Sequence, residues 1–85
     1  MYQLHYRKSA LKVLQSMPIA VRQKLLQELN QIALDPFQYS GDWKPLQGSE
    51  FWRLRVGKWR VICDIQQGEL VLLVVKIGAR GDVYK

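Results

Sequence analysis

The 85-residue chain carries 13 Lys and Arg against seven Asp and Glu, a formal net charge of +6, and has a pI near 9.8. Its 48% hydrophobic and 24% charged residues are typical of a globular protein and exclude a disordered tail, so we expect one small domain over residues 1–85. The charge is uneven, because residues 51–85 carry seven cationic and three acidic side chains. Such a basic chain favours an anionic partner, nucleic acid above all.

Few residue types are available for metal or thiol chemistry. Cys63 is the only cysteine, so no disulfide can form within the chain, and its expected place on an apolar strand face favours a buried hydrophobe over a nucleophile. The single histidine, His5, leaves a zinc site short of ligands and is expected to be solvated. No segment has the length of a signal-peptide core or a membrane span, so we expect a cytoplasmic protein with no membrane partner and no cofactor.

The first part of the chain predicts a short strand followed by two helices. Residues 2–6 alternate apolar and polar side chains, as a strand does, and residues 8–15 have the spacing of a short helix. We expect Ser16 to cap a second helix, Pro18 to lie in its first turn and Asp35-Pro36 to end it. One apolar stripe at helical spacing runs along that helix: Leu25, Leu26, Leu29, Ile32 and Ala33. The short break predicts an antiparallel helical hairpin.

Residues 36–50 are predicted to form a loop, because prolines and glycines punctuate them. A loop of this length is unusual in a compact domain, so we expect it to be packed or functional. Its aromatic side chains, Phe37, Tyr39 and Trp43, could stack on bases, although pinning the loop over the helices is the favoured interpretation.

The segment from Phe51 to Asp64 predicts two strands joined at Gly57-Lys58, because glycine at the first loop position suits a type II′ turn. If Val56 faces Trp59, then Arg55 opposes Arg60. Alternation places six side chains on one apolar face: Trp52, Leu54, Val56, Trp59, Val61 and Cys63. Three arginines share the other face: Arg53, Arg55 and Arg60.

Residues 70–77 predict a third strand that is apolar on both faces and therefore lies in the interior of the sheet. The order of elements implies an α+β fold: an N-terminal strand, a two-helix hairpin, and an antiparallel three-stranded meander with the helices packed on one face.

The arginine face points to a polyanionic ligand. Like charges directly opposite one another across a strand pair are destabilising, so stability alone does not select Arg55 opposite Arg60. The alternative is a solvated outer face that happens to be basic.

Three segments together resemble the RelE/ParE toxin superfamily: Pro45-Leu-Gln-Gly48, Phe51-Trp-Arg-Leu-Arg-Val-Gly-Lys-Trp-Arg-Val-Ile62 and Lys76-Ile-Gly-Ala-Arg-Gly-Asp-Val-Tyr84. The resemblance covers nearly the whole chain and implies the toxin of a type II toxin–antitoxin system, with a cognate antitoxin as partner. In the RelE branch it implies a ribosome-dependent endoribonuclease that cleaves mRNA without a metal.

The resemblance assigns catalytic roles to five residues: Arg53, Arg55, Arg60, Arg80 and Tyr84. Among them, Arg60 and Arg80 are expected on the phosphate, while Tyr84 is expected to stack on a base or transfer a proton. Ala79 stands where many relatives have histidine. Three lysines are expected to contact the RNA: Lys44, Lys58 and Lys85.

These residues suit cleavage by the 2′-OH of the RNA, because arginine forks bind phosphate and stabilise charge that develops on its oxygens. The general base stays open between the ribosome, geometry and charge alone, and Asp64, the nearest carboxylate in sequence. Two other functions stay open as well: a ParE-like DNA gyrase inhibitor, and a basic RNA- or protein-binding module without catalysis. The full set of four arginines and a tyrosine favours the nuclease.

Overall fold

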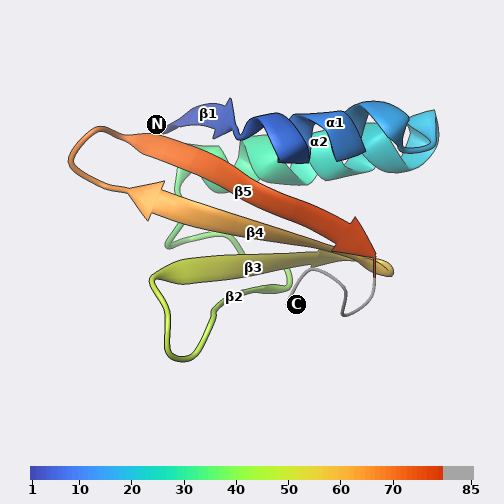
Figure 1. Ribbon diagram of the computed structural model, residues 1–85. Helices are drawn as coiled ribbons and strands as arrows, with labels where there is room; N and C mark the ends of the chain where they lie inside the picture. Colours follow the sequence, from blue (N-terminus) through green and yellow to red (C-terminus); the bar gives the residue numbers. More distant parts are fainter. Residues whose placement is uncertain (80–85) are drawn as a thin grey trace.

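The computed structural model describes residues 1–79, which form two helices and a five-stranded sheet (Figure 1). The elements in chain order are β1 (Gln3–Tyr6), α1 (Lys8–Ser16), α2 (Ile19–Leu34), β2 (Trp43–Pro45), β3 (Phe51–Val56), β4 (Trp59–Gln66) and β5 (Val71–Ala79). The strands lie in the order β1-β5-β4-β3-β2, with β1 parallel to β5 and the other three pairs antiparallel. The predicted α+β fold and its β3-β4-β5 meander are confirmed, and β5 is an interior strand as its apolar sequence predicts.

The two helices lie side by side along one face of the sheet (Figure 1). Their apolar stripes meet the inward side chains of β3, β4 and β5 in a single core, which includes Leu14, Leu25, Leu29, Leu54 and Leu72. The predicted stripe of α2 is confirmed, since four of its members are buried and Leu26 packs partly buried against them. No helix within residues 1–79 has both the length and the apolar character that crossing a lipid bilayer requires.

The junction between the helices differs from the sequence prediction. Ser16 is the last residue of α1, and its Oγ donates a hydrogen bond to the carbonyl oxygen of Val13 at 2.8 Å. It therefore does not cap α2, whose N-cap residue is Pro18. Ser16 bonds backwards because an exposed hydroxyl at a helix end readily reaches a carbonyl three residues earlier. The other end of α2 is as predicted, with Asp35 in extended backbone before Pro36.

The predicted loop over residues 36–50 contains a short strand that sequence reasoning missed. β2 pairs with β3 so that Trp43 opposes Leu54, Lys44 opposes Arg53 and Pro45 opposes Trp52. Pro45 is compatible with this place because β2 is an edge strand, where a missing N–H costs no ladder bond. A three-residue strand leaves too little alternation to be recognised among turn residues.

The β3–β4 hairpin has the register predicted from its turn. All six expected pairs are present, from Val56 opposite Trp59 at the turn to Phe51 opposite Asp64 at the far end. Gly57 has φ +59°, as the first position of a type II′ turn requires. The six side chains of the predicted apolar face are all buried in the core or packed against it.

Candidate nucleic-acid interface

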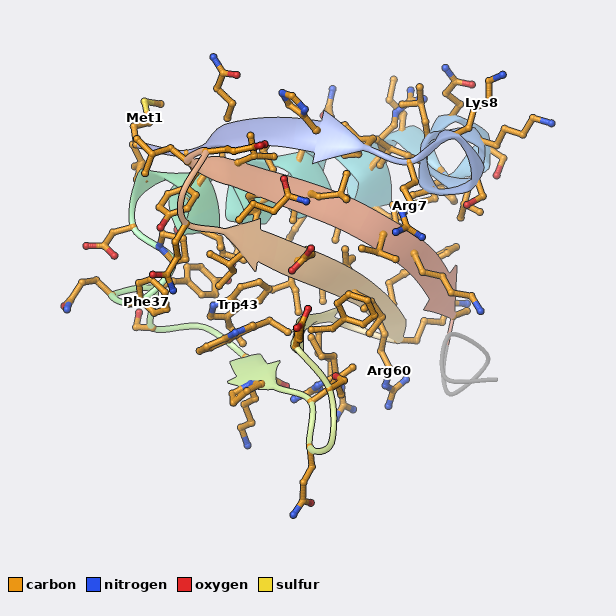
Figure 2. All side chains as sticks on the ribbon, turned by 60° about the vertical axis from the view of Figure 1, so that its left-hand side comes forward. Met1, Arg7, Lys8, Phe37, Trp43 and Arg60 are labelled. Atoms are coloured by element: carbon orange, nitrogen blue, oxygen red, sulfur yellow. The ribbon has the colours of Figure 1, made fainter. Side chains whose placement is uncertain are left out.

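The face of the sheet opposite the helices carries the arginines. Because side chains alternate along a strand, Arg53 and Arg55 of β3 and Arg60 of β4 point away from the core that holds Leu54 and Val61. Arg55 and Arg60 are directly opposite one another. In Figure 2 the Arg60 side chain extends away from the strands and from both helices. We call this side of the sheet the open face.

Arg55 and Arg60 are the least restrained of the three arginines. Arg55 is exposed, and its Nε donates a long hydrogen bond of 3.4 Å to the carbonyl oxygen of Gly57. Arg60 is half-buried and bonds no side chain within residues 1–79. Two guanidinium groups at directly opposed positions repel each other, so this arrangement favours an anion between or above them.

Arg53 is held by a carboxylate that sequence reasoning did not single out. Its Nη2 lies 2.9 Å from Oδ1 of Asp42, and the Arg53 side chain is only 14% exposed. Asp42 directly precedes β2, and its carbonyl oxygen accepts a hydrogen bond from the backbone N–H of Arg55. Only the pairing of β2 with β3 brings Asp42 to this place, and β2 was the element that the sequence did not reveal.

Lysines extend the cationic surface on both sides. Lys44 is opposite Arg53, and Lys58 is exposed in the β3–β4 turn. Lys76, which the sequence analysis did not select, is exposed and opposite Ile62 on β5. In the sequence, Lys76 is a single charged residue within an apolar strand. The face of the sheet on which its side chain lies depends on a β-bulge between Ile62 and Cys63.

Three predicted site residues, Arg80, Tyr84 and Lys85, lie outside the described residues. The described chain ends beside the arginines, since Gly78 pairs with Arg60 and Ala79 with Trp59.

Asp64, His5 and Cys63, the acid–base groups that the sequence analysis considered, lie away from the Arg55–Arg60 pair. Asp64 lies four residues from Arg60 along β4, roughly 13 Å at about 3.3 Å per residue. His5 is on β1, which β5 and β4 separate from β3. Burial raises the pKa of the Cys63 thiol, with a smaller effect from Asp64, so this thiol stays protonated and unreactive in the core. Within residues 1–79, no three His, Cys, Asp or Glu side chains form a metal-binding cluster.

The aromatic residues of the long loop hold it in place. Trp43 (Figure 2) is buried and donates its Nε1 hydrogen to the carbonyl oxygen of Pro36 at 2.9 Å. Its ring stacks on that of Trp52, with the ring centroids 5.2 Å apart. Tyr39 donates a short hydrogen bond to Glu28; burial, and then this bond, raise the pKa of its hydroxyl. Phe37 contacts Trp52 edge to face. These residues pin the loop as the favoured interpretation predicts, but only Tyr39 binds a helix, while Phe37 and Trp43 pack on Trp52 of β3.

Comparison with known proteins identifies the family of the chain. The model of the family described as "ParE toxin of type II toxin-antitoxin system, parDE" matches residues 4–84. The chain belongs to this family. It is therefore the toxin of a type II toxin–antitoxin system, within the superfamily that its sequence resembles. No protein of curated function matches the toxin significantly in sequence.

Solved structures share the fold. RelE in the archaeal RelE–RelB complex from Pyrococcus horikoshii OT3 is 27% identical, with a TM-score of 0.82 over 95% of the toxin and 97% of that chain. The isolated Escherichia coli RelE toxin is 22% identical, with a TM-score of 0.81 over 99% and 92%. The YoeB/ParE toxin from Agrobacterium tumefaciens is 18% identical, with a TM-score of 0.79 over 92% and 98%. The last two similarities concern the fold alone.

Proposed function

We propose that this toxin is a ribosome-dependent, metal-independent endoribonuclease that cleaves mRNA in the cytoplasm. The observation that carries the proposal is the placement of Arg55 directly opposite Arg60 on the open face, beside Arg53 and Lys44. Asp42 pairs with Arg53, but the cationic side chains of these three adjacent strands still outnumber that one carboxylate, and together they attract a phosphodiester backbone.

The reaction needs charge stabilisation more than it needs protein nucleophiles. The 2′-OH of the RNA attacks the adjacent phosphorus, the bond to the 5′-oxygen of the next nucleotide breaks, and a 2′,3′-cyclic phosphate and a 5′-hydroxyl result. Negative charge gathers on the phosphoryl oxygens in the transition state. Arg60, with its guanidinium directed outward, is assigned to these oxygens, and Arg55 and Arg53 to substrate positioning and charge stabilisation.

The remaining assigned residues extend this site. Arg80 is proposed on the phosphate and Tyr84 on a base or in proton transfer, while Lys44, Lys58 and Lys85 contact the RNA backbone. These assignments follow the resemblance of the Lys76–Tyr84 segment to the RelE branch, and Gly78 beside Arg60 is the neighbouring position that supports them.

We expect the ribosome to orient the mRNA for cleavage at the Arg55–Arg60 pair. Neither His5 nor Asp64 lies beside Arg55 and Arg60. Asp42 lies across from Arg55, but its carboxylate is paired with Arg53. Holding mRNA in an in-line geometry can contribute ~7–11 kcal/mol of the barrier. We therefore expect cleavage of translated mRNA and poor cleavage of naked RNA.

A cognate antitoxin is the second proposed partner, as RelB is for RelE in solved complexes. The surface offers an apolar hollow of about 370 Å³ between α2 and the β3–β4 turn, lined by Ala20, Val21, Lys24 and residues 56–59. Ile19 is 62% exposed at the start of the same helix. A net acidic segment with apolar anchors fits this hollow and the neighbouring arginines together.

The alternative function is inhibition of DNA gyrase, which the description of the matching family favours because that family is named after ParE. Such a toxin acts by binding and needs no phosphate-directed arginine pair.

One experiment separates the two. The toxin is induced in bacteria; primer extension maps cuts in mRNA, end-labelling identifies the new ends, and plasmid supercoiling is followed in parallel. We expect cuts in translated mRNA that leave 5′-hydroxyl ends and, with purified ribosomes kept intact, persist in EDTA. Intact mRNA together with lost supercoiling would contradict the nuclease and support the gyrase inhibitor.

A further inference from the structure

The open face also carries an apolar hollow beside the arginines. Its volume is about 350 Å³, and it is lined by side chains of the segment between β2 and β3 together with Phe51, Ile62, Val75 and Lys76. The lining is mostly apolar. This hollow is distinct from the one next to α2 and shares no lining residue with it.

The hollow lies on the same side of the sheet as the cations. Phe51 is two residues from Arg53 on β3, so both side chains point to the open face about 7 Å apart. Ile62 is opposite Arg53 on one side and Lys76 on the other. Although Ile62 is only 5% exposed, it is not part of the core under the helices. An apolar floor on a cationic face therefore forms the bottom of the hollow.

We infer that this hollow binds one nucleobase of the RNA, an inference that rests on the proposed function. A base offers flat apolar faces and polar edges, and it is joined to a phosphate backbone. The half-buried ring of Phe51 provides a stacking surface that tolerates any base. The exposed amide of Gln47 at the rim can hydrogen-bond a base edge.

Charge supports a nucleotide as the occupant. If an RNA strand places a phosphate on the Arg55–Arg60 pair and runs along β3, it passes Arg53, and its next nucleotides then reach Phe51. The base in the hollow therefore belongs to a nucleotide near the scissile phosphate, and it fixes the register of the strand on the arginines. An apolar side chain of the antitoxin is the competing occupant, which the experiment decides.

The test measures the binding of two probes by fluorescence anisotropy at low salt. One is a fluorescein-labelled RNA trinucleotide with 2′-O-methyl groups that prevent cleavage, and the other is an abasic ribose-phosphate trimer. Phe51→Leu should weaken binding of the trinucleotide about 5- to 100-fold, as loss of a stacked base does, and leave the abasic trimer unaffected. Its salt dependence should not change, because no phosphate contact is lost.

Two control variants accompany Phe51→Leu. Phe51→Tyr retains the ring and should retain affinity for the trinucleotide. Phe37→Leu removes an aromatic ring that is 52% exposed and does not line the hollow, so it should bind like the parent. Thermal unfolding of all three variants verifies that each is folded.

Several outcomes would overturn the inference: no trinucleotide binding by the parent, equal affinity of Phe51→Leu and the parent, or an equal loss for both probes. Weakened antitoxin binding with unchanged RNA affinity would assign the hollow to the antitoxin instead. None of these results depends on cleavage. If mRNA stays intact in induced cells while Phe51→Leu still loses affinity for the trinucleotide alone, the nuclease fails and the base site stands.

Discussion

The two faces of this sheet are made by the same strands and differ in almost everything else. On the face under the helices, Leu54, Val61 and Cys63 have no exposed surface. On the open face, their immediate neighbours Arg55 and Arg60 oppose each other and reach solvent. One register thus gives both the core and the cationic surface. Substitutions one residue apart along β3 and β4 should therefore separate stability from toxicity.

We call the face of the sheet under the helices the covered face. Substitutions there should have the largest effect on stability, because its side chains are buried. Leu54→Ala leaves a cavity where the side chain is fully buried, so we expect the free energy of unfolding to fall by about 2–5 kcal/mol. Arg55→Ala, one residue along and exposed, should change it by no more than about 0.5 kcal/mol. Urea unfolding of both purified variants measures the difference. Similar losses for the two would show that the open face contributes to the core.

The open face should give the largest effect on toxicity. Arg60→Ala removes an outward guanidinium assigned to the scissile phosphate, and we expect the cleavage rate to fall about 10²–10³-fold. Stability should hold or rise slightly, because repulsion with Arg55 is relieved. Growth arrest at matched expression, together with primer extension, measures the effect.

The matched control for this prediction is Lys12→Ala, which removes an exposed cation from α1 on the other side of the sheet. If Lys12→Ala and Arg60→Ala relieve growth arrest equally, total charge matters and the position of Arg60 does not.

The alternation of apolar and polar residues predicted the β3–β4 hairpin well. Strict alternation on either side of Gly57-Lys58 fixed the register from Phe51 to Asp64, because a slip of one residue would expose the whole apolar face. The stripe of α2 was equally clear, since its apolar positions recur along one side of the helix.

Features that depend on long-range pairing were not predictable in this way. β2 has three residues and is stabilised by Trp43 in the core, so its own sequence carries little strand signal. The place of Asp42 beside Arg53, and thus the neutralisation of one site arginine, follows from that strand alone. The side taken by Lys76 follows from a bulge, which shifts the alternation of β5 without a mark in its sequence.

The covered face should also have its own dependence on pH. Burial raises the pKa of Cys63 above its ordinary value of 9.0. Above that pH the thiol ionises in the unfolded chain and stays protonated in the folded one. The unfolded state then binds fewer protons than the folded state, so the free energy of unfolding falls as pH rises, by up to about 1.4 kcal/mol per pH unit. Below about pH 8 the thiol is protonated in both states, so its stabilising contribution is fully present.

Cys63→Ala should flatten this slope. The comparison is the free energy of unfolding of the parent and the variant between pH 8 and 10.5. Taking the difference cancels the raised pKa of Tyr39, which both proteins share, whereas the smaller part of the Tyr6 shift that comes from Cys63 is lost with the thiol. Parallel curves would mean that water reaches the thiol on the covered face.

The smallest effect concerns the Asp42–Arg53 ion pair, which neutralises charge on the open face. Asp42→Asn removes the carboxylate from Arg53 and keeps the shape of the side chain, so we expect stability to change by less than about 1 kcal/mol. The freed guanidinium can then bind a phosphate, and the slope of log affinity against log salt for single-stranded RNA should steepen by about 0.7. Glu69→Gln makes the same charge change in the turn between β4 and β5, away from the arginines, and should leave the slope unchanged. Equal slopes for the two variants would show that Asp42 acts only through net charge, and unequal slopes that it restrains Arg53.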